Sequence, residues 1–98
     1  MILSQQEIKN CVEDFFKDKP VNKVWLFGSY ARGDFNEESD VDILVSIEKD
    51  SKVGIRYFGW NEEIEEVLHK KVQIVSAGWE SKYIKPFIDA DKVLLYEK

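Results

Sequence analysis

The chain has 98 residues, of which 44% are hydrophobic and 13% aromatic, so its own side chains can build one core but not a second. Its net charge of −5 argues against nonspecific binding to nucleic acid, which relies on clustered lysine and arginine side chains. The sequence has no apolar run of membrane-spanning length, no signal-peptide pattern and a single cysteine, Cys11, so we expect one cytoplasmic domain over residues 1–98.

The first predicted element is a helix over residues 5–17. Ser4 and Glu7 form the S-x-x-E pattern of a capping box, which marks its beginning, and Pro20 follows its end. Apolar residues recur behind the cap at helical spacing: Ile8, Cys11, Val12, Phe15 and Phe16. Because Cys11 lies in this stripe, we interpret it as a small core residue rather than a nucleophile.

Two strands with a short turn between them are predicted next. Residues 24–27 form a continuous apolar run, which is typical of a strand buried on both faces. Gly28 and Ser29 end that run, residues 30–32 form a helical turn, and Gly33 suits a left-handed exit from it. A polar loop then leads to a second strand over residues 40–47. Its alternation places two sets of residues on opposite faces: Val41, Ile43 and Val45 on one, and Asp40, Asp42 and Leu44 on the other.

The second half of the chain adds a long helix, a strand, a short helix and a closing strand. The long helix covers residues 55–69, and the strands cover 71–76 and 92–96. Apolar residues mark one face of the long helix (Tyr57, Trp60, Ile64, Val67 and Leu68) and lie on the short one (Ile84, Phe87 and Ile88). This order predicts an α/β (α+β) domain, a small mixed sheet of three to four strands with flanking helices, and leaves the pairing order open.

Residues 28–42 combine three features that suit the binding of phosphate and a cation. A strand that ends at Gly28 and enters a helical turn leaves unpaired backbone N–H groups, which can hold an anion close to the glycine backbone. Asp40 and Asp42 lie two residues apart on a strand, so their carboxylates project from one face and can share Mg²⁺. Each feature alone is more often a plain turn or a solvated strand edge. Together they predict phosphoryl or nucleotidyl transfer.

These segments resemble a known signature. The signature of the DNA polymerase beta-like nucleotidyltransferase superfamily is similar to residues 27–33, FGSYARG, followed by residues 39–45, SDVDILV. The chain most resembles the minimal nucleotidyltransferases, which are about this size and often act as antitoxins of HEPN-domain proteins. The resemblance implies the polymerase beta-like fold. It also implies that Gly28, Ser29 and Arg32 bind the triphosphate, and that Asp40 and Asp42 are catalytic and bind Mg²⁺ as two ions.

The same resemblance implies a Mg²⁺-dependent transfer of a nucleoside monophosphate from a nucleoside triphosphate, ATP in the first instance, to a hydroxyl acceptor. The acceptor that it suggests is a HEPN-domain toxin. Transfer of nucleotides to RNA is a weaker interpretation, because the chain is acidic and has no second domain to grip RNA. The base of the nucleotide, the acceptor and any homo-oligomer stay open.

One position departs from the family pattern. The family supplies a third carboxylate from the strand after the long helix, where this chain has Gln73. An amide oxygen can bind a cation, but it is neutral and a poor base. The enzyme could therefore use a neighbouring acid or a substrate group, react slowly, or have become a catalytically weakened nucleotide-binding antitoxin that acts by occlusion. One of the acids on the preceding helix could approach the site, but a solvated face is the favoured position for them: Glu62, Glu63, Glu65 and Glu66.

Overall fold

The computed structural model describes residues 4–48, 56–78 and 80–98 of the chain. None of the helices in these ranges is long and apolar enough to cross a membrane. The elements follow the predicted order: α1 (Gln5–Phe16), β1 (Val21–Phe27), α2 (Ser29–Arg32), β2 (Val41–Ile47), α3 (Arg56–Leu68), β3 (Val72–Ser76), α4 (Lys85–Asp91) and β4 (Val93–Glu97). The predicted α/β class is confirmed.

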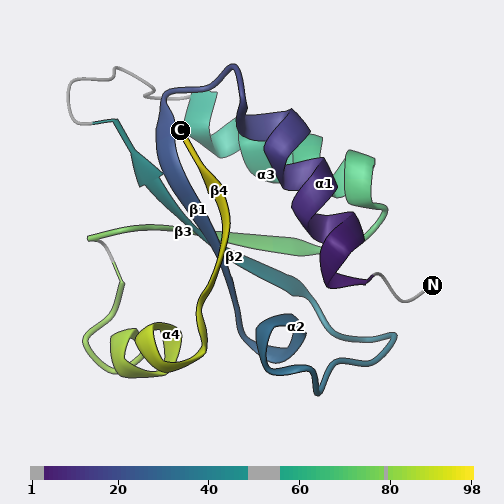
Figure 1. Ribbon diagram of the computed structural model, residues 1–98, viewed down its shortest axis with the longest axis vertical. Helices are drawn as coiled ribbons and strands as arrows, with labels where there is room; N and C mark the ends of the chain where they lie inside the picture. Colours follow the sequence, from purple (N-terminus) through teal and green to yellow (C-terminus); the bar gives the residue numbers. More distant parts are fainter. Residues whose placement is uncertain (1–3, 49–55, 79) are drawn as a thin grey trace.

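The four strands form one mixed sheet in the order β3-β2-β1-β4 (Figure 1). Strand β1 pairs antiparallel with both β2 and β4, whereas β2 and β3 are parallel and are joined through α3. The register places Asp42 of β2 beside Phe27 on one side and beside Gln73 on the other. This topology places Asp42 and Gln73 on neighbouring strands.

Helices α1 and α3 lie together over one face of the sheet, and α2 and α4 lie toward the opposite end of the molecule (Figure 1). Residues Val41, Ile43 and Val45 of β2 are fully buried in the main core under α1 and α3, as their alternation predicted. Leu44 on the other face is also buried, and so is Ile88 of α4. Helix α4 therefore shields part of the face opposite the main core.

The two long helices bury the residues that their periodicity predicts. Each contributes three side chains to the main core: Ile8, Val12 and Phe16 from α1, and Trp60, Ile64 and Leu68 from α3. A fully buried side chain of this size contributes about 1.5–3 kcal/mol through the hydrophobic effect. Val67 is 50% exposed, so its predicted place on the core face is wrong, because it lies at the margin of the stripe. Ile55 and the side chain of Tyr57 lie outside the described residues.

The capping box predicted for α1 is present, and the predicted beginning of β1 differs from the observed one. The Glu7 N–H donates to Ser4 Oγ and the Ser4 N–H donates to Glu7 Oε1, both at 3.1 Å, which completes the capping box of α1. Strand β1 begins at Val21 rather than at residue 24, because its first residues also pair with β2. Val21 is buried but is followed by the polar Asn22 and Lys23, so a search for a continuous apolar run misses these residues.

Candidate active site

The turn after β1 places the Gly28 backbone directly beside the Asp42 carboxylate. Gly28 has φ 78° and ψ −154°, a conformation that is open almost only to glycine. A Cβ atom at this position would lie 2.4 Å from Asp42 Oδ2, well inside van der Waals contact. The glycine therefore supplies both the unusual backbone conformation and the space that the carboxylate occupies. The structure brings together two of the predicted site residues.

Helix α2 presents backbone N–H groups next to this carboxylate. The Ala31 and Arg32 N–H groups donate to the Gly28 carbonyl at 3.1 and 3.0 Å, and Gly33 ends the helix in the left-handed conformation that was predicted. The N–H groups of Ser29 and Tyr30 precede those of Ala31 and Arg32 in the chain. The first N–H groups of a helix have no partner within the helix. Because α2 is a single turn, its dipole is small, and the binding of an anion would depend on those N–H groups.

Asp40 and Asp42 form a pair of like charges. Asp42 is half-buried, and its burial, followed by the repulsion from Asp40, raises its pKa from 3.8 to about 6, against the opposing attraction of Arg32. Asp40 is exposed and lies immediately before β2 rather than within it. The charge of Asp40 thus acts on Asp42 although Asp40 precedes the strand, and Arg32 opposes the resulting rise in the pKa.

The residues present fit the Mg²⁺ that the sequence signature implies. Among the described residues, no group of three or more His, Cys, Asp or Glu side chains could hold a metal. The protein would thus supply the Asp40 and Asp42 carboxylates, with the amide oxygen of Gln73 on the adjacent strand as a neutral neighbour. Mg²⁺ prefers one or two carboxylates completed by water and substrate phosphate oxygens, and this donor set meets that preference.

The raised pKa of Asp42 has a measurable consequence for stability. Because the folded pKa of about 6 exceeds the ordinary 3.8, ionisation of Asp42 opposes folding; this cost is fully present above the folded pKa and absent below the unfolded one. Partial exposure screens the cost to roughly 1 kcal/mol. Urea unfolding in EDTA should therefore show Asp42→Asn more stable than wild type by that amount near neutral pH, and equal to it at about pH 3. A constant difference at both pH values would contradict this prediction.

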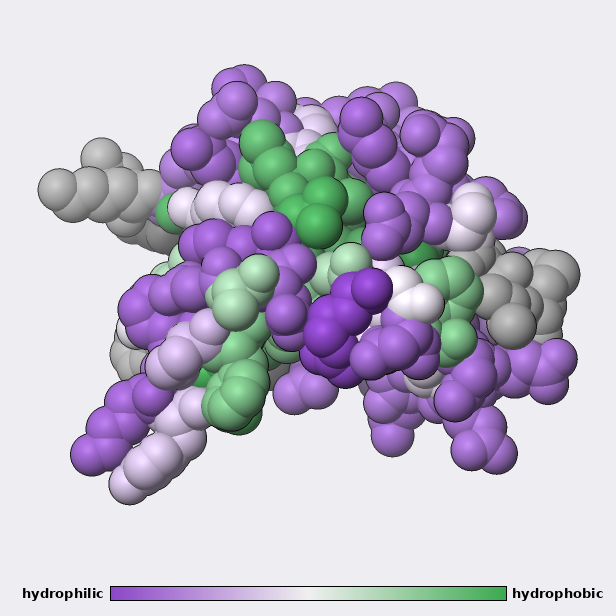
Figure 2. Space-filling view, turned by 60° about the horizontal axis from the view of Figure 1, so that its bottom comes forward, coloured by the Kyte–Doolittle hydropathy of each residue, from purple (hydrophilic) through white to green (hydrophobic). Residues whose placement is uncertain are grey.

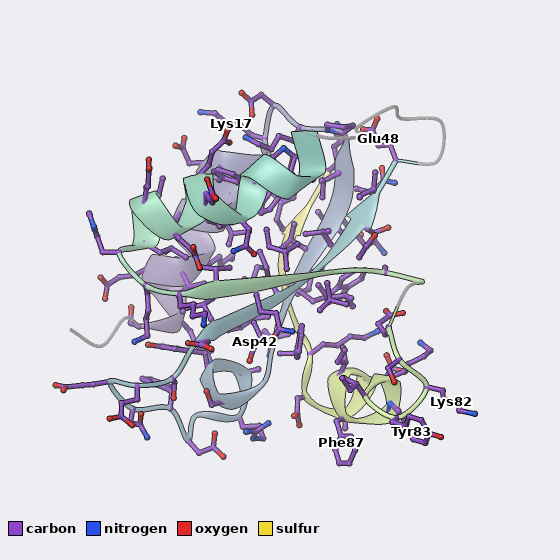
Figure 3. All side chains as sticks on the ribbon, turned by 180° about the vertical axis from the view of Figure 1, so that it is seen from behind. Lys17, Asp42, Glu48, Lys82, Tyr83 and Phe87 are labelled. Carbon is purple, nitrogen blue, oxygen red and sulfur yellow. The ribbon has the colours of Figure 1, made fainter. Side chains whose placement is uncertain are left out.

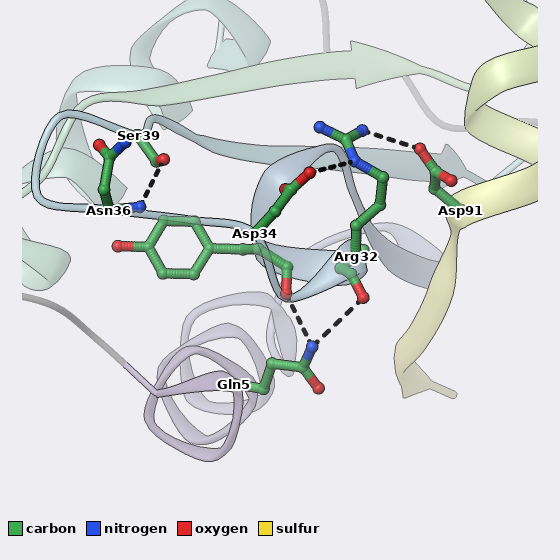
Figure 4. Close-up of polar contacts among 8 residues, drawn as sticks. Gln5, Arg32, Asp34, Asn36, Ser39 and Asp91 are labelled. Atoms are coloured by element: carbon green, nitrogen blue, oxygen red, sulfur yellow. Dashed lines mark hydrogen bonds and ion pairs between the residues drawn. The ribbon is translucent and has the colours of Figure 1, made fainter.

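Arg32, predicted to position phosphates, is held by two carboxylates (Figure 4). Its Nε lies 3.1 Å from Asp34 Oδ2, and its Nη1 lies 3.0 Å from Asp91 Oδ2, at the end of α4. The Arg32 side chain is 47% exposed, so these ion pairs are exchangeable with another anion at modest cost. No pattern in the sequence indicates a role for Asp91, because it is distant from Arg32 in the chain and belongs to a different helix.

Asp42 and Gln73 open onto a pocket between the sheet and the segment that leads into α4. Its volume is about 290 Å³, and Figure 3 shows Asp42 on the side of the sheet toward α2 and α4. The other lining residues are Phe27, Val75, Glu80, Ser81, Ile84 and Ile88. A larger groove of about 730 Å³ between α1 and β4 contains no predicted site residue, so size alone does not mark the site. Glu80 and Ser81 were missed because they follow β3 without any motif.

The acids of α3 do not reach this pocket. Glu65 accepts a hydrogen bond from the Val72 N–H at 2.9 Å, at the beginning of β3. Glu62, Glu63 and Glu66 are exposed, and none of these acids lines the pocket beside Asp42. The exposed acids thus lie on the solvated face of α3, the position that the sequence favoured for them, and none stands in for a third carboxylate beside Asp42.

The profile of the nucleotidyltransferase domain family matches residues 6–95. The chain belongs to this family. A putative protein adenylyltransferase of Methanocaldococcus jannaschii is 34% identical over 91 residues, which cover 90% of this chain and 91% of the relative. A second relative from that organism is 50% identical over 44 residues, which cover 45% of this chain and 43% of its own length. The family resemblance drawn from the signature is confirmed.

Solved structures show the same nucleotidyltransferase fold. A toxin–antitoxin complex crystallised with AMP-PNP aligns with a TM-score of 0.78 and 22% identity, covering 92% of this chain and 73% of the other. A tri-AMPylated Shewanella oneidensis HEPN toxin in complex with an MNT antitoxin aligns with a TM-score of 0.73 and 21% identity, covering 96% and 73%. At these identities the likeness concerns the fold alone.

Proposed function

We propose that the chain, as a single domain over residues 1–98, is a Mg²⁺-dependent protein adenylyltransferase of the cytoplasm. It transfers AMP from ATP to a side-chain hydroxyl of a HEPN-domain toxin and so acts as the antitoxin. The observation that carries this proposal is the Asp42 carboxylate packed against the Gly28 backbone, with Asp40 beside it. A phosphate-binding turn in contact with paired carboxylates is what nucleotidyl transfer requires.

Each predicted site residue has a role in this proposal. The N–H groups at the start of α2 and the Ser29 hydroxyl donate to the triphosphate, which approaches the backbone at Gly28. Asp40 and Asp42 hold Mg²⁺, which when bound offsets the phosphate charge and stabilises the leaving pyrophosphate. Arg32 exchanges its exposed ion pairs with Asp34 and Asp91 for the phosphates, since a guanidinium binds either anion through two parallel N–H groups.

The surface beside the pocket supports a protein acceptor. The pocket volume of about 290 Å³ is at the low end for ligand sites, so it suits one side chain better than a whole nucleotide. Apolar surface lies over α4 in the lower left of Figure 2. In and just before this helix, Phe87 is 71%, Ile84 50% and Tyr83 75% exposed. Figure 3 shows Tyr83 and Phe87 projecting away from the sheet. Clustered exposed aromatic groups are typical of protein interfaces.

A second candidate function rests on Gln73. The register places its neutral amide beside Asp42, where a third carboxylate would complete the site of an active nucleotidyltransferase. The alternative is an antitoxin that binds the nucleotide but has lost turnover, and that blocks its partner by occlusion.

Calorimetric titration of ATP with Mg²⁺ into wild type and Gln73→Asp separates these functions. Pyrophosphate release and the transfer of labelled AMP to a HEPN-domain protein are followed on the same samples. We expect wild type to bind the nucleotide and transfer AMP, and removal of Mg²⁺ with EDTA to abolish transfer. Binding without transfer in wild type, restored by Gln73→Asp, would establish the binding antitoxin instead. Absence of binding in both folded proteins would reject both functions.

A further inference from the structure

Glu80 is a carboxylate of the pocket that the predicted site does not use. It lies between β3 and α4, is half-buried, and lines the pocket together with Asp42 and Gln73. The Gly78 N–H donates to its Oε2 at 2.8 Å, which fixes the orientation of the carboxylate on the turn. Within the described part of the chain, its Oε1 makes no hydrogen bond or ion pair. One oxygen is thus anchored by the backbone, and the other is left to accept a proton.

Other acids around the site are engaged elsewhere. Asp34 and Asp91 are paired with the Arg32 guanidinium, and both approach it within 3.1 Å. Asp40 and Asp42 are the two carboxylates that hold Mg²⁺ in the proposed function. In the pocket of about 290 Å³, Glu80 is the acid that lines the walls beside Asp42.

The proposed transfer requires a proton acceptor in this pocket, and Glu80 can act as one. An acceptor hydroxyl must lose its proton as it attacks phosphorus, and a positioned carboxylate promotes this step, whereas the Gln73 amide cannot. The Glu80 carboxylate comes from the loop that directly follows the strand of Gln73. Phe27, Val75 and Ile88 give the pocket apolar walls, so a carboxylate there is less screened by water than on the open surface.

We propose that Glu80 is the general base for the acceptor hydroxyl and compensates for the missing carboxylate at position 73. This inference rests on the proposed adenylyl transfer. The hydroxyl proton moves to Glu80 Oε1 while the hydroxyl oxygen forms a bond to the α-phosphorus of ATP. The bond between that phosphorus and the oxygen bridging to the β-phosphate breaks, and its electron pair leaves with pyrophosphate.

The test uses Glu80→Gln in the full chain, with Glu63→Gln as the matched control on the exposed face of α3. The glutamine keeps an oxygen for the Gly78 N–H, so the turn is retained while the base is lost. We expect Glu80→Gln to lower the rate of AMP transfer by roughly 10²–10⁴-fold, the usual contribution of a general base. Calorimetry should give an affinity for ATP with Mg²⁺ within about twofold of wild type, because ground-state binding does not need the base. Glu63→Gln should match wild type in both measurements.

Restoration of a carboxylate separates catalysis from a structural role. Adding Gln73→Asp to Glu80→Gln should recover at least about tenfold in transfer rate, an effect that a lost turn contact would not produce. If Glu80→Gln fails to fold, Glu80→Ala with added formate supplies the same test, since formate should restore transfer only if a base was removed. Transfer at the wild-type rate by Glu80→Gln, or a loss that neither Gln73→Asp nor formate restores, would overturn the role of Glu80. Absence of transfer by wild type would reject the proposed function itself.

Discussion

Replacement of Asp42 by asparagine should abolish AMP transfer while the fold survives. The substitution keeps the shape of the side chain beside Gly28. It removes one of the two charges that we propose hold Mg²⁺. A bound metal contributes several kcal/mol of transition-state stabilisation, so we expect a fall of about 10³-fold or more in the transfer rate. Incorporation of labelled AMP into a HEPN-domain protein measures the loss. Circular dichroism and the urea midpoint confirm that the variant is folded.

The exposed acid Glu66 on α3 provides a control of the same charge change, and Glu66→Gln should transfer AMP like wild type. The same Asp42→Asn protein also distinguishes the two candidate functions. If it folds, transfers nothing and still neutralises the toxin, the antitoxin works by occlusion. If it binds the toxin but no longer neutralises it, modification is the active step. Undiminished transfer by the folded variant would show that Asp42 is not a metal ligand.

The parts of the site that the sequence predicted correctly are those fixed by short-range structure. The turn at Gly28 follows from a buried strand that meets a glycine, and the alternation along β2 fixes the faces of Val41 and Asp42. These signals depend on neighbours in the chain. The order of the strands, the contact of Arg32 with Asp91 and the entry of Glu80 into the pocket depend on segments that meet only after folding. Hydrophobic periodicity does not predict these tertiary contacts.

The place of the α3 acids was open from the sequence for the same reason, although a solvated face was favoured for them. Their sequence position just before β3 suggested proximity to Gln73, but the parallel crossover from β2 to β3 carries α3 over the opposite face of the sheet. Glu65 consequently reaches the backbone at the beginning of β3 rather than the pocket. The loop after β3 returns to the face of Asp42, and this is why an acid of that loop can stand near the site. Topology, rather than distance along the chain, decides which carboxylates are available.

Substitution of Gly28 by alanine should damage both the fold and the site. The new Cβ would lie 2.4 Å from Asp42 Oδ2, and φ 78° with ψ −154° is strained for any residue with a side chain. We expect a loss of about 2–4 kcal/mol in the free energy of unfolding, from backbone strain and displacement of the carboxylate together. Transfer of AMP should be lost as well, because Asp42 cannot keep its position. Urea unfolding and the transfer assay measure the two effects.

Gly33 offers a matched control for Gly28, since it also has a positive φ, of 90°, but nothing lies within 4 Å of the Cβ position. Gly33→Ala should therefore show the backbone strain alone, about 1 kcal/mol, and retain transfer. A double-mutant cycle isolates the contact: in an Asp42→Ala background, which lacks the carboxylate, the cost of Gly28→Ala should fall. It should stay above that of Gly33→Ala, because φ 78° with ψ −154° is more strained than the left-handed conformation of Gly33. If the cost of Gly28→Ala is the same with and without the Asp42 carboxylate, backbone conformation alone explains the glycine. If the cost falls, the glycine is required because the carboxylate and the phosphate-binding turn occupy adjoining space.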